Sequence, residues 1–187
     1  MGTHRRSILR DIFVGTTVER VVRTGPFPVL MVNNEAQRRY ENVMATIDMS
    51  AASANALGKA RRVGLLSGVR TTLLHAFFPM ARGKLFIAGV DNESMQQYVT
   101  DERKRANDEL AAFLVANSIE ASGWKMTLEE GTPIEAISRA VKLLSPDLLI
   151  MGTHGKSNFL KILIGSVAEE AMRTLDVDIL AVPPAKE

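Results

Sequence analysis

Cysteine is absent from this sequence of 187 residues, and its absence excludes several kinds of site at once. Without a thiol the chain has no disulfide framework, no zinc–thiolate or iron–sulfur centre and no thiol nucleophile. A run of about 20 apolar residues is also missing, so we expect no membrane partner. Residues Met1 to Arg6 do not lead into an apolar segment with a cleavage site, so we expect a cytoplasmic protein without a signal peptide.

A large excess of charge of one sign is missing as well, because the formal net charge is only +2. Residues 1–42 contain seven arginines and four acidic residues, whereas residues 43–187 contain 16 basic and 17 acidic residues. The positive excess is therefore confined to the N-terminal part, and the rest of the chain is close to neutral. This distribution predicts no nucleic-acid partner.

The common catalytic and metal-binding motifs are not found. The three histidines, His4, His75 and His154, are far apart in the sequence, and no His-Glu-x-x-His pattern or acidic cluster accompanies them. A nucleophile elbow of the form Gly-x-Ser-x-Gly is missing too. We therefore predict no catalytic residue and no metal ligand. We expect His75 to pack within an apolar strand and His154 to be exposed.

An internal repeat is present. When the chain is shifted by 150 positions against itself, 12 of the 32 pairs from Met1 to Val32 are identical, among them Met1-Gly2-Thr3-His4 on the segment 151–154. The first block therefore looks like the last part of an earlier copy. We divide the chain into a C-terminal remnant of a first domain (residues 1–32), a polar linker (33–40) and a complete domain (41–187).

The complete domain alternates between strand-like and helical patterns. A capping box from Thr132 to Glu135, with proline at the first helical position, predicts a helix to about Leu144. Strands that alternate with helices form parallel sheets. We predict an α/β fold with an open, parallel five-stranded sheet, helices on both faces, and an N-terminal helix–strand fragment of the preceding copy. The expected strands are 43–47, 69–78, 125–130, 147–151 and 178–182; the expected helices are 51–66, 94–122, 132–144 and 165–175, with a loop at 79–93.

A glycine pattern follows the fourth expected strand. Gly152 and Gly155 come directly after this strand, and Gly165 and Ser166 open the next helix after nine further residues. Glycines let the backbone turn sharply and let a phosphate approach closely. The first amides of a helix have no internal partner and can bind an anion at the positive end of the helix dipole. The pattern suits a phosphate chain, although these glycines are also compatible with a simple turn.

The spacing Gly-x2-Gly-x9-Gly-Ser/Thr is typical of the universal stress protein family, and this sequence resembles that family over residues 41–183. The internal repeat resembles a tandem-domain member whose first copy is truncated. The segments that carry the resemblance are Thr46–Ser50, Leu74–Ala76, Gly131–Glu135, Met151–Val167 and Asp178–Pro183.

The resemblance implies a site for an adenine nucleotide, either ATP or AMP or ADP, with Mg²⁺ as an accompanying ion. Asp48 is also compatible with another role, that of capping the helix that follows it. The contacts implied by the resemblance are Thr46, Asp48 and Ala76 around adenine and ribose, and Met151, Gly152, Gly155, Gly165, Ser166 and Val167 around the phosphates.

The N-terminal remnant departs from the family pattern. Arg5 stands where the second glycine of the motif belongs, and the strands that would contact adenine are missing. We therefore predict that no nucleotide binds to this block, and we expect a helix from about Gly15 to Thr24. The resemblance further implies that residues 29–32 pair antiparallel with residues 179–182, and that the chain forms a homodimer or pseudo-dimer through its final strand.

Three functions remain open on the sequence alone. The first is an ATP-binding regulatory or signalling module of the stress response with at most slow ATP hydrolysis, which the intact glycine loop favours. The second is a Mg²⁺-dependent ATPase or phosphotransferase that uses the same site. The third is a nucleotide-independent dimerisation or scaffold module in which the glycine loop is only structural.

Overall fold

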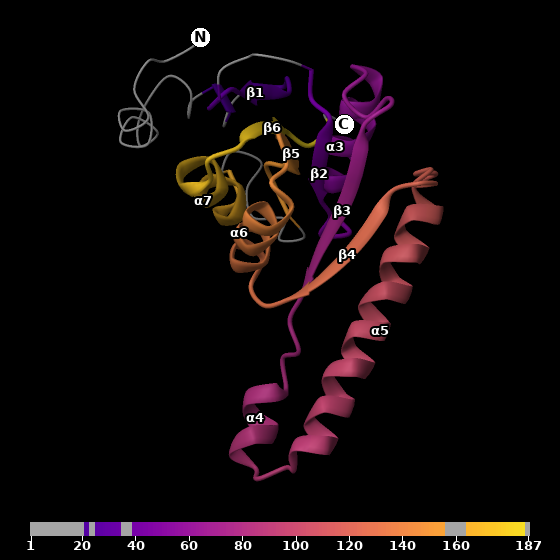
Figure 1. Cartoon of the computed structure of the whole chain (residues 1–187), viewed down its shortest axis with the longest axis vertical. Helices are drawn as coiled ribbons and strands as arrows, with labels where there is room; N and C mark the ends of the chain where they lie inside the picture. The colour runs from indigo at the N-terminus through magenta and orange to yellow at the C-terminus, as the bar shows by residue number, and fades with distance from the viewer. Residues whose placement is uncertain (1–20, 23–24, 35–38, 156–163, 186–187) are drawn as a thin grey trace.

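The computed structural model describes residues 21–22, 25–34, 39–155 and 164–185. It contains a six-stranded sheet with the order β1–β6–β5–β2–β3–β4 and helices on both of its faces (Figure 1). Five strands are mutually parallel, and the short β1 is antiparallel to β6. The predicted α/β fold with a parallel sheet is confirmed. The strands are β1 (Val29–Met31), β2 (Asn42–Thr46), β3 (Arg70–Phe77), β4 (Lys125–Glu130), β5 (Leu148–Gly152) and β6 (Asp178–Val182); the helices are α3 (Ala51–Arg62), α4 (Arg82–Ile87), α5 (Asn92–Ala116), α6 (Pro133–Leu144) and α7 (Ser166–Thr174).

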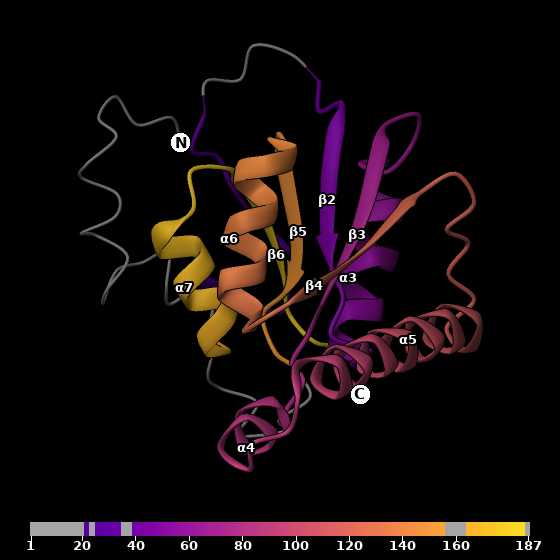
Figure 2. The ribbon, with the colours of Figure 1, turned by 60° about the horizontal axis from the view of Figure 1, so that its bottom comes forward.

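The central strands are buried on both faces of the sheet. Successive side chains along a strand point to opposite sides. In β5, Leu149 and Met151 therefore pack in the cluster with α6 and α7, whereas Leu148 and Ile150 pack in the cluster with α3 and α5. Figure 2 shows these two helical layers on either side of the sheet. Burial on both faces explains why this strand is apolar along its whole length.

Local capping determines where the helices begin and end. The Glu135 carboxylate accepts from the Thr132 backbone N–H (3.3 Å) and hydroxyl (2.7 Å), so α6 begins with the predicted capping box. At its other end, Ser145 takes a left-handed conformation with φ 44°. The cap of α3 is Ser50, whose hydroxyl accepts from the Ser53 N–H at 3.2 Å. The residue that caps α3 is therefore Ser50 and not Asp48.

Three expectations about helices were wrong in extent. Helix α3 ends at Arg62 and not at residue 66, because Gly64 takes a positive φ of 78°. Helix α5 ends at Ala116 and not near Ser122, because Ser118 takes a positive φ of 52° that a helix cannot continue through. The expected loop at 79–93 contains α4, a short helix that packs against α5. None of the helices within the described ranges is long and apolar enough to cross a membrane.

Strand β1 occupies the outer edge of β6. Val29 lies opposite Ala181 and Met31 opposite Ile179, so the antiparallel pairing expected for residues 29–32 is confirmed. The expected helix at 15–24 falls outside the described residues except at 21–22, and Arg5 lies outside them as well. The origin of this segment as a remnant, and a homodimer through the final strand, remain predictions.

The linker after β1 is hydrogen-bonded to the beginning of β6. The buried Asp178 carboxylate accepts from the backbone N–H groups of Asn33 (2.8 Å) and Asn34 (3.0 Å) and from the Tyr40 hydroxyl (2.7 Å). Burial, followed by this hydrogen bond to Asp178, raises the pKa of Tyr40 above its ordinary value, so the hydroxyl stays a donor. One buried carboxylate thus fixes both ends of the described linker.

Candidate functional site

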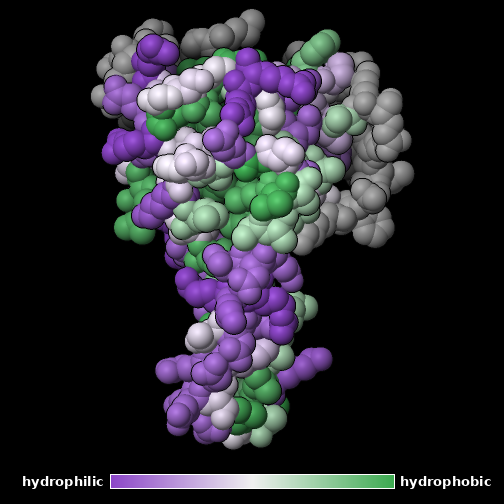
Figure 3. Space-filling model, turned by 90° about the vertical axis from the view of Figure 1, so that its right-hand side faces the viewer, coloured by the Kyte–Doolittle hydropathy of each residue, from purple (hydrophilic) through white to green (hydrophobic). Residues whose placement is uncertain are grey.

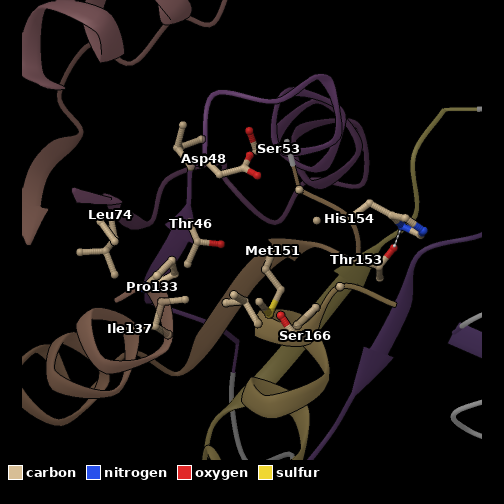
Figure 4. Close-up of a pocket in the computed structure, with 17 residues that line it drawn as sticks. Thr46, Asp48, Ser53, Leu74, Pro133, Ile137, Met151, Thr153, His154 and Ser166 are labelled. Carbon is tan, nitrogen blue, oxygen red and sulfur yellow. Dashed lines mark hydrogen bonds between the residues drawn. The ribbon is translucent and has the colours of Figure 1, made fainter. Parts of the chain in front are cut away.

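A cavity of about 190 Å³ lies at the carboxyl ends of β2, β3 and β5 (Figure 4). From β2 the chain builds the sheet on one side through β3 and β4, and then on the other side through β5 and β6. Open α/β sheets bind their ligands at such a reversal of strand order. The lining residues are Thr46, Ile47, Asp48, Ser53, Leu74, Ala76, Pro133, Ile137, Met151, Gly152, Thr153, His154, Gly155, Gly165, Ser166, Val167 and Ala168.

The structure brings all nine residues of the expected nucleotide site into the lining of this one cavity. They come from the end of β2, from β3, from the end of β5 and from the beginning of α7. The sequence interpretation did not include Pro133 and Ile137 of α6, which also line the cavity. A signal for them was present, because helices in a parallel α/β sheet begin at the same edge where the preceding strands end.

The three loop glycines are required by close packing and not by a left-handed backbone. None of them takes a positive φ. A Cβ on Gly155 would lie 2.9 Å from Asp48 Oδ2, and a Cβ on Gly165 would lie 3.2 Å from the Thr153 carbonyl oxygen. A Cβ on Gly152 would meet the backbone carbonyl group of Ala52 at 3.3 Å. A side chain at any of these three positions would therefore crowd neighbouring atoms at this edge of the cavity.

The two ends of the glycine loop are joined directly. The Gly165 N–H donates to the Thr153 carbonyl (2.7 Å), and the Thr153 N–H donates to the Val182 carbonyl (2.9 Å). These bonds fix the first turn of α7 against the end of β5. Among the described residues no side chain caps this turn, because its N-cap is Gly165. The first amides of α7 and the exposed Ser166 hydroxyl therefore face the cavity side of the helix with donors available for an anion.

In the part of the chain that the structure describes, the ionisable side chains of the cavity lining are Asp48 and His154. Asp48 Oδ1 accepts from the Ser50 N–H (3.0 Å) and hydroxyl (2.5 Å), which orients the carboxylate so that Oδ2 faces Gly155. His154 was expected to be exposed, and this was wrong: it is half-buried, and its Nδ1 lies 2.9 Å from the Thr153 hydroxyl. Burial lowers its pKa. Its ring points away from the centre of the cavity (Figure 4).

The remaining histidine and metal expectations concern the surroundings of the cavity. His75 is buried in β3, and its Nδ1 donates to the Ile47 carbonyl (2.7 Å), so the predicted packing within a strand is confirmed. Within the described parts of the chain, no three His, Cys, Asp or Glu side chains come together as a candidate metal site.

Comparison with known proteins identifies the fold and the family. Universal stress protein MJ0577 of Methanocaldococcus jannaschii is 25% identical over 154 residues, which are 76% of this chain and 94% of that protein. Its solved structure aligns with a TM-score of 0.64 and 22% identity over 80% of this chain and 100% of its own. Universal stress protein A homolog 1 of Coxiella burnetii is 25% identical over 145 residues, covering 76% of this chain and 96% of its own.

A further solved structure is a universal stress protein in complex with cAMP, with a TM-score of 0.50 and 22% identity over 79% of this chain and 100% of its own. These structural likenesses support the fold. Residues 39–183 match the profile of the universal stress protein family, and this match spans most of the sequence. The chain therefore belongs to the universal stress protein family.

Proposed function

We propose that this chain binds an adenine nucleotide, ATP or else AMP or ADP, in the cavity between β2, β3 and β5. The protein would act in the cytoplasm as a regulatory or signalling module of the stress response, with at most slow ATP hydrolysis. One observation carries the proposal: nine residues expected from the family motif come from four segments and line a single cavity. A family member solved with cAMP, which is itself an adenine nucleotide, supports the choice of ligand.

The cavity offers different chemistry along its length. Apolar side chains from β3, α6 and β5, namely Leu74, Ile137 and Met151, form surfaces on which a flat base can stack (Figure 4). Asp48 Oδ2 would accept from a ribose hydroxyl, because Oδ1 is already held by Ser50. The first amides of α7 and the Ser166 hydroxyl would donate to the phosphates, where the helix dipole favours negative charge.

The size of the cavity indicates how such a ligand would lie. Its volume of about 190 Å³ is below the range of about 300–1,000 Å³ that is typical of small-molecule sites. A nucleoside would therefore fill the cavity, and the phosphates would extend out of it along the glycine loop. Mg²⁺ would then be bound mostly by phosphate oxygens and water, as is usual for this ion.

The ionisable groups of the lining support binding more than rapid catalysis. A general base must reach the proton that it removes, directly or through one water. Asp48 Oδ1 accepts from Ser50 and Oδ2 is assigned to the ribose, while the His154 ring points away from the centre of the cavity and lies against Thr153. For this reason we favour a nucleotide-responsive module over an ATPase or phosphotransferase.

The test is a calorimetric titration of ATP with Mg²⁺ into the full chain, repeated with ADP, AMP and cAMP. We expect one site per chain. At a ligand concentration of about 100 times Kd, the free energy of unfolding should rise by about 2.7 kcal/mol. Absence of both heat and stabilisation for all four nucleotides would overturn the proposal in favour of a nucleotide-independent module.

Matched glycine variants localise the binding. Gly155→Ala places a methyl group 2.9 Å from Asp48 Oδ2 and should weaken ATP binding at least about tenfold. Gly58→Ala in α3 is the control, because a Cβ there meets no atom within 4 Å. Ser166→Ala removes only an exposed hydroxyl and gives a second test that does not depend on packing. Unchanged affinity in both Gly155→Ala and Ser166→Ala would place the nucleotide elsewhere.

A further inference from the structure

Residues 78–105 form an arm that projects from the sheet. The arm consists of a connector (78–81), α4, a turn (88–91) and the first part of α5. No residue of α4 is buried, and the fully buried residues of α5 are Ala106, Leu110 and Leu114, all beyond the arm. Figure 1 shows the arm reaching away from the strand ends, with α4 beside the neighbouring part of α5.

The arm exposes large apolar side chains that nothing in the described chain covers. Phe86 is 74% exposed and Ile87 is 86% exposed at the end of α4, while Met80 and Phe78 in the connector are 78% and 55% exposed. The space-filling view in Figure 3 shows apolar residues at the far end of the arm, next to a hydrophilic surface along its length. Exposed apolar side chains gathered at the end of a projecting element are typical of interaction sites on proteins.

The arm is fixed at its root and is therefore preorganised for an interaction. The Arg82 guanidinium forms an ion pair with the Glu130 carboxylate at the end of β4. The Arg103 guanidinium lies 5.3 Å from the centre of the Phe77 ring. The Ala81 N–H donates to the Tyr98 hydroxyl (3.0 Å), which joins the connector to α5. Binding of a partner to the tip (Phe86, Ile87 and the turn 88–91) would therefore cost less conformational entropy than binding to a flexible loop.

Charges on the two sides of the apolar tip have opposite signs. Lys84 precedes Phe86 and Ile87 in α4, whereas Asp91 and Glu93 follow them at the beginning of α5. A two-fold axis through Ile87 would place the Lys84 ammonium of one copy near the carboxylates of the other, twice. Such self-complementarity is the signature of an isologous contact, and it disfavours an anionic lipid surface as the partner.

We propose that the tip of the arm is a contact surface for the arm of a second copy of this chain. Large aromatic side chains bury about 150–250 Å² each when they are covered. At their observed exposure, Phe86 and Ile87 would bury about 650 Å² over both copies, below the value of about 1,200 Å² at which specific interfaces begin. The contact is therefore a weak dimer, with a dissociation constant on the order of 10–100 μM. It is separate from the β1–β6 edge of the sheet.

Sedimentation equilibrium of the full chain tests the contact. The wild type should change from monomer to dimer as the protein concentration rises through about 10–100 μM. Phe86→Ser combined with Ile87→Ser should raise the dissociation constant at least about tenfold, because it removes the apolar centre. Leu143→Ser is the matched control: Leu143 is 80% exposed on α6, away from the arm, and its loss should leave the equilibrium unchanged.

A charge exchange tests the two-fold arrangement itself. Lys84→Glu should weaken the dimer, because the carboxylate introduced at this position would repel Asp91 and Glu93 of the other copy. Adding Glu93→Lys should restore part of the self-association, because position 93 then offers the opposite charge while Asp91 still repels the new carboxylate. Restoration in the double variant supports the isologous contact, and failure to restore it while Lys84→Glu weakens the dimer overturns the two-fold arrangement.

Other occupants of the tip give distinct results. A wild type that stays monomeric at about 1 mM overturns the proposal. So does a dimer that persists in the Phe86→Ser, Ile87→Ser variant, because it must form elsewhere on the chain. Cosedimentation of a monomeric wild type with vesicles of phosphatidylcholine and phosphatidylglycerol would assign the tip to a lipid surface and also overturn it.

Discussion

The sheet body and the arm (residues 78–105) contain similar apolar side chains but place them in opposite surroundings. In the body, Leu148, Leu149 and Ile150 of β5 are fully buried between two helical layers. In the arm, Phe86 and Ile87 are mostly exposed, and α4 has α5 as its neighbour. The stability of the fold therefore resides in the body, whereas the arm holds its shape through helix capping and a few contacts at its root. Its apolar residues remain available for a partner.

The largest effect should separate a body residue from an arm residue. Leu149→Ala removes a fully buried side chain of β5 and should lower the free energy of unfolding by about 2–5 kcal/mol. Ile87→Ala in α4 should change it by less than about 0.5 kcal/mol in dilute solution, because the side chain has few contacts to lose. Urea titrations of both variants measure the difference. Equal losses would remove the distinction between body and arm.

The second prediction tests whether the hydrogen bonds to Asp178 hold the linker (33–40) to the sheet body. Asp178→Ala leaves the N–H groups of Asn33 and Asn34 and the Tyr40 hydroxyl without their acceptor, and we expect a loss of about 2–3 kcal/mol. Tyr40→Phe is the control and should cost about 1 kcal/mol, because Asp178 keeps its backbone donors. Hydrogen exchange of β1 should accelerate in Asp178→Ala. A change below the cost of Tyr40→Phe would show that the linker is not held to the body.

A smaller effect is expected at the root of the arm. Arg103→Met keeps most of the side-chain length but removes the cation above the Phe77 ring, which should cost about 0.5–1 kcal/mol. Lys104→Met removes a neighbouring exposed charge and serves as the control. The clearest measurement is hydrogen exchange in the first part of α5, which should become faster in Arg103→Met alone. Equal exchange rates in the two variants would contradict this role of Arg103.

The smallest effect depends on pH and lies at the cavity. Burial lowers the pKa of His154, so the folded state binds a proton less readily than the unfolded chain. This contribution to stability is lost as the pH falls below about 6.5, the ordinary value for histidine. His154→Gln should therefore lose less stability than the wild type between about pH 7.5 and about pH 5.5. Parallel thermal unfolding curves with the same pH dependence would contradict the burial of this ring.

The sequence predicted the body well because several independent patterns agree there. The bounds expected for β4 and β6 match the structure, and the α6 capping box is present as expected. The nine residues expected at the nucleotide site all line one cavity. The glycine spacing orders the loop and the first turn of α7 in one motif, whereas Thr46, Asp48 and Ala76 came from the family resemblance. Pro133 and Ile137 were missed because their place in the cavity follows from the packing of α6 across the sheet and lies outside the glycine motif.

The arm was predicted less well for a physical reason. Met95, Val99, Ala106 and Leu110 form an apolar stripe at helical spacing, but such a stripe does not say what covers it. In the structure Ala106 and Leu110 pack on the body, whereas the earlier residues lie in the arm beside α4. Helix α4 itself was expected to be loop, because six residues with a glycine among them are not a stable helix on their own.

The position of β1 on β6 has a consequence for how this edge of the sheet competes with other chains. The strand is connected to the body by about ten residues and is held close by Asp178. A segment joined through so short a connection acts at an effective concentration in the millimolar range. A strand from another molecule present at micromolar concentration would be outcompeted about a thousandfold. The edge is thus closed by the chain itself, and release of Asn33, Asn34 and Tyr40 from Asp178 is the step that would open it.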